Sequence, residues 1–143
     1  MFKTIVVGTD GSETAERAVD RAAEIAAATE GRVHLVSAYA SRPVRVAGGA
    51  EAEAGDWAIG GDFNADAVLQ RTLERLRSQG IDVQDHAPKG DPADGIIEVA
   101  TRESADLIVI GSVGMQGARR ILGSVPNKVS HHAPCDVLIV RTA

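Results

Sequence analysis

Residues 111–124, GSVGMQGARRILGS, combine four glycines with a final serine and directly follow an apolar run, DLIVI. Glycine permits positive φ and a close approach of the backbone to a ligand. If a helix begins near Ser124, its first amides have no partner within the helix and can bind a phosphate. The helix dipole contributes only about 0.3–1 kcal/mol at an exposed site, so several amides would have to act together. Arg119 and Arg120 could add positive charge, although adjacent arginines are usually solvated.

The donors that this segment would offer depend on where the helix begins. With Ser124 as the N-cap, Pro126 removes one N–H, which leaves the amides of Ser124, Val125 and Asn127 and the Ser124 hydroxyl. The same residues also suit a tight turn followed by an ordinary serine cap. From this segment alone, phosphate binding and turn formation both stay open.

A second stretch, GTDGSE at residues 8–13, also follows an apolar run. It does not match the Walker pattern, because Glu13 stands where the second glycine is required, and it does not match G-x-G-x-x-G. Asp10 would repel a phosphate, but its carboxylate can accept hydrogen bonds from ribose hydroxyls. Alternatively, Asp10 or Ser12 caps the following helix, since Asp10 and Glu13 have the spacing of a capping box.

The other reactive side chains form no recognisable motif. Cys135 is the single cysteine and lies beside an apolar run, which favours a buried, unreactive thiol. His131 and His132 are adjacent in a predicted helix, so they point in different directions and cannot chelate one metal ion. His34 and His86 have no partner that the sequence identifies. We therefore predict no metal site and no catalytic residues, which argues against a dedicated enzyme.

The elements that must position these residues alternate between two kinds. Apolar runs of strand length occur at residues 4–8, 33–38, 107–111 and 137–140, with a weaker run at 81–87. Helical patterns occur at residues 13–29, 64–79, 92–104 and 124–133. Strands that alternate with helices predict an α/β fold with a five-stranded parallel sheet and helices on both faces.

Helix boundaries are marked by residues with known positional preferences. Gly31 and Gly80 are predicted to stop the first two helices, and Asp91 with Pro92 to cap and begin the third. The predicted apolar stripes are Ala15, Ala18, Val19, Ala22, Ile25 and Ala26 in the first helix and Ala67, Val68, Leu69, Leu73 and Leu76 in the second.

Length and charge narrow the possible functions. A chain of 143 residues suits one domain, residues 1–143, with a probable mobile loop at 41–63 in which Trp57 could anchor the loop to the body or to a partner. The net charge of -5 provides no basic face, so we expect neither nucleic acid nor a membrane as partner. The apolar start is too short for a signal sequence, and we expect a cytoplasmic protein.

Four stretches together resemble the small single-domain members of the universal stress protein family. They are VVGTDGSETAERAVDRA, the G-D-P before the third helix, ADLIVIGSVG and LGSVPNKVSHHAPCDVLIVR, and they cover nearly the whole chain outside residues 41–63. The resemblance implies the Rossmann-like fold of the adenine nucleotide alpha hydrolases, with strand order 3-2-1-4-5. It also implies a homodimer joined through the last strand, here residues 137–141.

The resemblance further implies an adenine nucleotide. Family members that bind ATP show Gly, two residues, Gly, nine residues, Gly and then Ser or Thr, whereas this chain has eight residues between Gly114 and Gly123. By position, Asp10 would face the ribose and adenine, and the backbones of Ala38 and Ile110 would contact the base. The predicted binding residues are Thr9, Asp10, Ala38, Ile110, Gly111, Gly114, Gly123, Ser124, Val125 and Asn127.

The function that the resemblance implies is a regulatory, dimeric stress-response protein. ATP, with Mg²⁺ or Mn²⁺ carried on its phosphates, is the expected ligand, and cyclic AMP or AMP would suit a shorter loop. Any ATP hydrolysis or self-phosphorylation is expected to be slow. One alternative is a nucleotide-free interaction module of the same fold, which the missing loop residue favours. Another is an ATP-dependent enzyme of a related α/β group, although the Ser-Gly-Gly-x-Asp-Ser loop of one large branch is absent.

Overall fold

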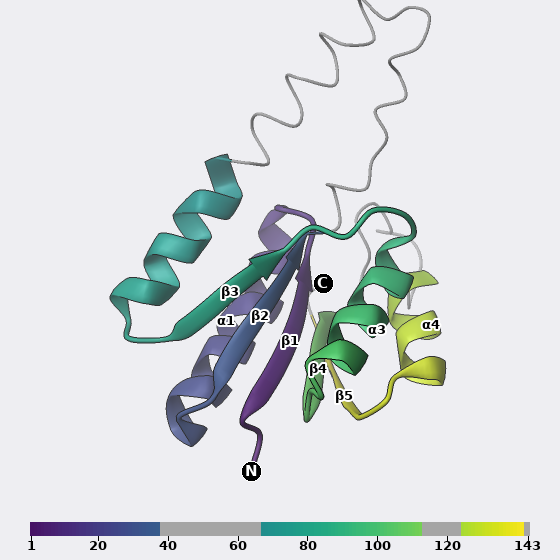
Figure 1. Ribbon diagram of the computed structural model, residues 1–143. Coiled ribbons are helices and arrows are strands. Elements are labelled where there is room, and N and C mark those ends of the chain that lie inside the picture. The colour runs from purple at the N-terminus through teal and green to yellow at the C-terminus, as the bar shows by residue number, and fades with distance from the viewer. Residues whose placement is uncertain (38–66, 113–123, 142–143) are drawn as a thin grey trace, which may run out of the picture.

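Five parallel strands form one sheet in the computed structural model, which describes residues 1–37, 67–112 and 124–141. The strands are β1 (Thr4–Thr9), β2 (Arg32–Ser37), β3 (Asp82–His86), β4 (Leu107–Gly111) and β5 (Asp136–Val140). Their spatial order is β3-β2-β1-β4-β5, which confirms the expected 3-2-1-4-5 topology (Figure 1). Each strand begins and ends within one residue of the apolar run that predicted it.

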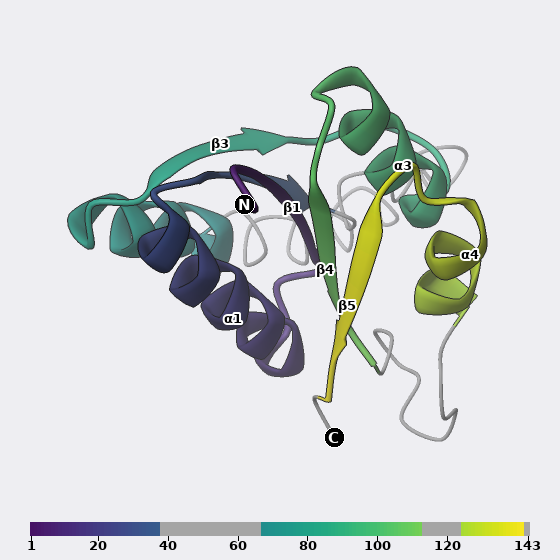
Figure 2. The same ribbon diagram turned by 90° about the horizontal axis from the view of Figure 1, so that it is seen from below.

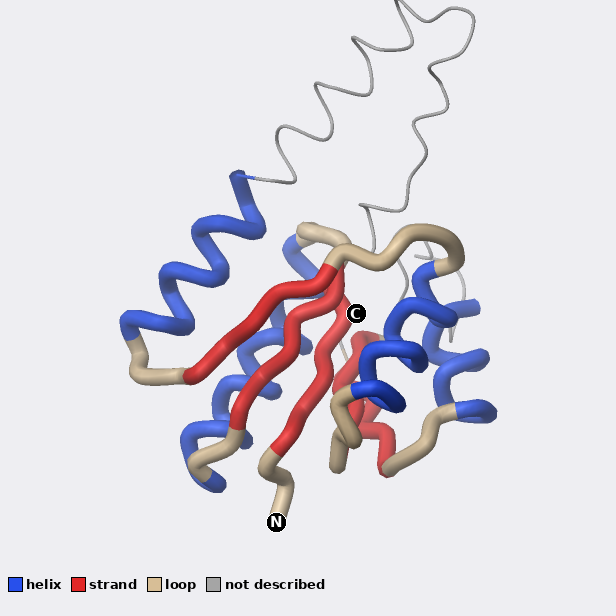
Figure 3. The backbone as a smooth tube through the Cα atoms, in the orientation of Figure 1, coloured by secondary structure: helices blue, strands red, loops and turns tan. Residues whose placement is uncertain are grey.

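Four helices cover the two faces of this sheet, as expected (Figures 2 and 3). They are α1 (Glu13–Thr29), a helix over residues 67–78, α3 (Pro92–Arg102) and α4 (Ser124–His132). The first two pack on one face, and α3 and α4 pack on the other. Figure 2 shows α1 on the opposite side of the sheet from α3 and α4.

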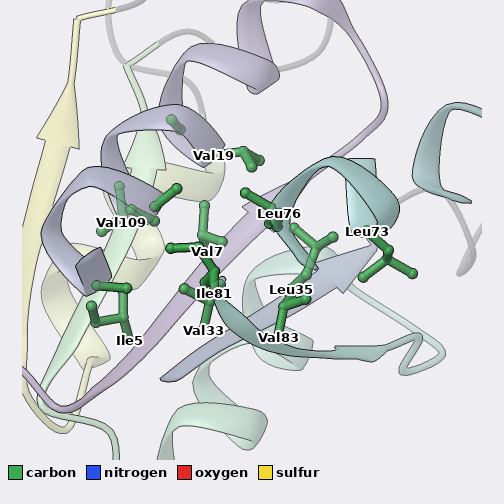
Figure 4. Close-up of a cluster of buried hydrophobic side chains, with 14 of the residues drawn as sticks. Ile5, Val7, Val19, Val33, Leu35, Leu73, Leu76, Ile81, Val83 and Val109 are labelled. Carbon is green, nitrogen blue, oxygen red and sulfur yellow. The ribbon is translucent and has the colours of Figure 1, made fainter. Parts of the chain in front are cut away.

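Alternation along the strands divides the buried side chains between two cores. Ile5 and Val7 point toward α1, whereas Val6 points toward α3, because successive strand residues face opposite sides of a sheet. Figure 4 shows side chains of α1, of the helix over residues 67–78 and of the sheet meeting in the first core. The inner strands β1, β2 and β4 are buried on both faces, which explains their nearly continuous apolar sequences. The edge strand β3 is mostly exposed and polar, which explains why its apolar run was weaker.

α1 ends at Thr29, as predicted, but the left-handed residue that follows it is Glu30 rather than Gly31. Glu30 is the C-cap and has the left-handed conformation, with φ of 59°. Gly31 serves a different purpose, because a Cβ atom there would lie 2.7 Å from the backbone oxygen of Phe2. The chain therefore needs glycine at this position for close backbone packing rather than for a left-handed turn.

Other predicted boundaries are confirmed. Asp91 caps α3, its carboxylate accepting a hydrogen bond from the Asp94 amide, and Pro92 occupies the first helical position. Gly80 has φ of 82° just after the helix over residues 67–78. The loop predicted at residues 41–63, with Trp57, lies outside the described residues.

Among the helices that the structure describes, none has the length and apolar character needed to cross a membrane.

Candidate functional site

The carboxyl ends of β1 and β4 lie side by side at the point where the chain reverses its direction of progress through the sheet. From β1 the chain moves outward to β2 and β3, and it then crosses over β1 to reach β4 and β5. Pairing between β1 and β4 runs only from Ile5–Leu107 to Val7–Val109, although the strands continue to Thr9 and Gly111. Ligands of open α/β folds bind at this position, outside the carboxyl ends of the diverging strands.

The chain turns sharply between β1 and α1, and hydrogen bonds of Thr9, Asp10 and Ser12 hold this turn. The Gly11 amide donates to Thr9 Oγ1 at 3.1 Å, and the Ser12 amide donates to Asp10 Oδ1 at 2.9 Å. Gly11 adopts φ of 83°, which this sharp turn requires. Two successive side-chain-to-backbone hydrogen bonds therefore fix the direction in which Asp10 leaves the sheet.

Ser12, and not Asp10, caps α1. The Ala15 amide donates to Ser12 Oγ at 3.2 Å, and the helix begins at Glu13. The capping-box interpretation of Asp10 and Glu13 is therefore wrong, because Asp10 lies two residues before the N-cap. Asp10 is half-buried, and within the described residues its Oδ2 accepts no hydrogen bond. The carboxylate keeps acceptor capacity for a ligand.

At the end of β4, Ile110 is buried and Gly111 is half-buried. The Ser112 amide donates to the Val140 carbonyl at 2.8 Å, so the exit of β4 is held against the end of β5. Three predicted binding residues, Ala38, Gly114 and Gly123, lie outside the described residues, as do Arg119 and Arg120. Their assignment stays a prediction.

The start of α4 differs slightly from the expectation. Ser124 is the first residue of the helix rather than the residue before it, so its own amide belongs to the first turn. Ser124 and Asn127 are exposed, Val125 is half-buried, and Pro126 is buried in the core on this face. The first turn carries no acidic residue of its own, which favours an anionic ligand at this helix end.

An ion pair ties the start of α3 to Lys128 in the second turn of α4. Lys128 Nζ lies 2.9 Å from Asp94 Oδ1 and 3.4 Å from Asp91 Oδ2. The hydrogen bond to Asp94 raises the pKa of Lys128, so the cation persists at neutral pH. Since α3 begins at the carboxyl edge of the sheet, this contact holds the start of α4 near the same edge.

Ser37 is a polar residue at this edge that the sequence did not single out. It ends β2, pairs in register with Thr9 and is 1% exposed, yet its hydroxyl has no hydrogen-bond partner within the described residues. A buried hydroxyl without a partner is costly, so it marks a place where a ligand could donate or accept. The sequence signal that could have identified Ser37 is its position directly before Ala38, a predicted binding residue.

The sequence identified no partner for His34 or His86, and the structure shows that they are each other's partners. His34 Nδ1 and His86 Nε2 lie 2.9 Å apart, and burial lowers the pKa of both imidazoles. Both residues project from the same face of neighbouring strands, because His34 pairs in register with Gln84, two residues before His86. Only the register of β2 and β3 reveals this contact between residues far apart in the chain.

Comparison with known proteins agrees with this architecture. The model of the universal stress protein family matches residues 1–141. Universal stress protein Rv1636 of Mycobacterium tuberculosis is 39% identical over 143 residues, which cover 99% of this chain and 97% of that protein.

Two solved structures of similar proteins contain nucleotides. A universal stress protein in complex with cAMP is 35% identical, with a TM-score of 0.71 and coverage of 99% of this chain and 98% of that one. The universal stress protein from Archaeoglobus fulgidus in complex with dAMP is 28% identical, with a TM-score of 0.69 and coverage of 98% of each chain.

Proposed function

The chain belongs to the universal stress protein family, and from that premise we propose that it binds an adenine nucleotide between the carboxyl ends of β1 and β4. The observation that carries this proposal is the separation of the two strands beyond the pair Val7–Val109. Asp10 follows the end of β1, and its carboxylate can accept a further hydrogen bond. The first turn of α4 comes after β4 in the chain, on the other side of the gap between the two strand ends. Similar proteins with cAMP and dAMP bound support the ligand class.

Each part of the proposed site matches one part of a nucleotide. Asp10 accepts hydrogen bonds from the ribose hydroxyls, and the backbones at Ile110 and Ala38 contact the adenine. The phosphates bind to the amides at the start of α4 and to the glycines at 111, 114 and 123. Thr9 supports the site by fixing the turn that carries Asp10.

The nucleotide that we propose is ATP, with a divalent ion on its phosphates, or cyclic AMP. The loop between Gly114 and Gly123 has eight residues, one fewer than the family's ATP-binding pattern. Cyclic AMP carries a single phosphate and needs fewer amides. We propose that binding changes the protein's interactions with cytoplasmic partners rather than supporting rapid turnover.

Calorimetric titration with ATP, AMP and cyclic AMP, together with thermal melting, tests the proposal. A ligand at 100 times its dissociation constant stabilises the native state by about 2.7 kcal/mol. We expect heat and a melting shift with at least one of the three nucleotides. If none produces either signal at millimolar concentration, the chain is the nucleotide-free interaction module instead.

Two matched variants locate the site. Asp10→Ala should weaken nucleotide binding about tenfold or more, because a hydrogen bond to a charged group contributes about 1.5–3 kcal/mol. Ser12→Ala removes the helix cap and should lower the free energy of unfolding by about 1 kcal/mol while largely keeping the affinity. Equal affinities for Asp10→Ala and the unaltered chain would show that the ribose lies elsewhere.

A further inference from the structure

Three side chains from three different elements meet on the face of the sheet that α3 covers. His34 comes from β2, His86 from the end of β3, and Glu103 from the residue after α3. His34 Nδ1 lies 2.9 Å from His86 Nε2, and His34 Nε2 lies 4.0 Å from Glu103 Oε1. One ligand atom from each residue can be chosen so that all three lie within 4.8 Å of one another.

The position of His34 is unusual for an imidazole. It is 1% exposed in a strand whose neighbouring residues, Val33, Leu35 and Val36, are all buried and apolar. A polar ring in such a strand loses hydration unless its nitrogens find partners. His86 supplies a partner for Nδ1 at 2.9 Å, whereas Glu103 Oε1 lies 4.0 Å from Nε2, which is too far for a hydrogen bond. His34 therefore has one ring nitrogen without a hydrogen-bond partner within the described residues.

We propose that His34, His86 and Glu103 bind a divalent transition-metal ion, with Zn²⁺ as the best match. Two imidazoles and one carboxylate are a donor set that zinc accepts, with water in the fourth position. Two nitrogens that are each about 2.1 Å from one ion lie roughly 3–3.4 Å apart. The observed separation of 2.9 Å therefore needs only a small opening of the pair.

Metal binding requires a specific arrangement of protons. His34 would bind through Nδ1, on the side of His86, and keep its proton on Nε2. Glu103 Oε1 now lies 4.0 Å from Nε2, so the Glu103 side chain has to turn to reach an ion at Nδ1. His86 would bind through Nε2 and carry its proton on Nδ1, where Arg102 Nη2 now lies 3.3 Å away.

Arg102 has to turn away from His86 when the ion binds. Otherwise the protonated Nδ1 of His86 and Nη2 of Arg102, which are both hydrogen-bond donors, would face each other. Its guanidinium is half-exposed and already lies 3.8 Å from Glu98 on the outer surface of α3. Its Nε also lies 3.5 Å from Glu103 Oε2, so rotation toward Glu98 exchanges that ion pair for another and removes a positive charge from beside the metal.

An ion can reach the cluster from the amino edge of the sheet. A pocket of about 400 Å³ opens there. Its charged and titratable lining residues are His34, Glu103, Glu30, Asp82, Lys3 and Arg32. The amino edge is opposite the carboxyl edge at which the proposed nucleotide site lies. The metal site is therefore independent of nucleotide binding and can be tested without it.

Zinc titration of tag-free, chelator-treated protein against a chromogenic competitor tests the proposal. We expect one Zn²⁺ per chain and a raised melting temperature. His86→Ala and Glu103→Gln should each weaken binding by at least the roughly 10-fold to 100-fold seen when an outer-shell partner is removed. Both residues are only partly buried, so these variants are expected to fold.

The chain provides its own control, because it contains four histidines and the other two, His131 and His132, are exposed on α4. A His131→Ala/His132→Ala double variant should bind zinc as the unaltered chain does. The Co²⁺-loaded protein should show visible absorption bands of a four-coordinate site that are lost in His86→Ala. Absence of zinc binding, or binding that survives His86→Ala and disappears in the double variant, overturns the proposal and leaves His34 and His86 as a hydrogen-bonded pair.

Discussion

Asp10 and Ser12 lie two residues apart, and their side chains serve different purposes. The Ser12 hydroxyl accepts a bond from the Ala15 amide and so satisfies the start of α1. That leaves Asp10 free of the helix, with one oxygen bound to the Ser12 amide. A carboxylate held by its own backbone in this way is rigid before any ligand arrives, which lowers the entropy cost of binding.

The reactivity of the Cys135 thiol can be predicted from the groups around it. Cys135 packs against the core between the sheet, α3 and α4, and burial, together with Asp136 and Asp106, raises the pKa of its thiol. Because the thiolate is the reactive form, native protein at pH 8 should react with iodoacetamide more slowly than urea-unfolded protein. Mass spectrometry over time measures both rates. A faster reaction in the native state would mean that the site activates the thiol.

At the scale of the element, the end of α1 contains a conformational strain that a substitution can remove. Glu30 has φ of 59°, which costs a residue with a side chain roughly 1–2 kcal/mol. Glu30→Gly should raise the free energy of unfolding by up to about 1 kcal/mol after allowing for the greater entropy of glycine in the unfolded chain. Urea denaturation followed by circular dichroism measures the change.

The matched control for this prediction is Glu30→Ala. Alanine removes the same carboxylate but keeps a Cβ atom, so the left-handed conformation stays unfavourable. Equal stabilisation by alanine and glycine would show that the charge, rather than the backbone conformation, limits stability at this helix end.

The link between α1 and the helix over residues 67–78 depends on both apolar and charged contacts. Arg75 donates to Glu16 and Asp20 of α1 at 2.7 and 2.8 Å, beside the buried Leu73 and Leu76. Partly exposed ion pairs contribute little, about 0–1 kcal/mol each. The apolar residues therefore hold the two helices together, and the arginine sets their alignment.

At the scale of the whole molecule, β5 leaves one edge of the sheet available. It pairs only with β4 among the described strands, and Val137, Leu138 and Ile139 are partly exposed. An apolar edge strand is a template for pairing with a second chain. We propose that two copies associate through β5, as the family resemblance implied.

A charge on this edge tests the proposed dimer. Ile139→Lys should shift the protein from dimer to monomer at micromolar concentration, because lysine on an edge strand opposes pairing between chains. Sedimentation velocity measures the mass. Ala27→Lys, on the exposed side of α1, adds the same charge away from β5 and should leave the dimer intact. A monomeric unaltered chain, or a dimeric Ile139→Lys variant, would contradict the assignment.

Much of this architecture could be predicted from the sequence because its signals are local. The inner strands β1, β2 and β4 are nearly continuous apolar runs, and α3 begins at Asp91 and Pro92, whose preferences depend on a few neighbouring residues. The order of the strands came from the family resemblance, and the structure confirms it. The candidate residues Thr9, Asp10, Ile110 and Gly111 lie at adjacent strand ends, since parallel strands present their carboxyl ends along one edge.

By itself, the sequence determined the alternation of strands and helices. It also determined where along the chain the residues lie that could bind a ligand. Only the tertiary structure decided which distant residues meet. The contact of His34 with His86 depends on the register of β2 against β3, and the left-handed Glu30 depends on Gly31 packing against the backbone of Phe2. Neither has a local signal, because each arises from the packing of segments that the chain brings together only when the sheet forms.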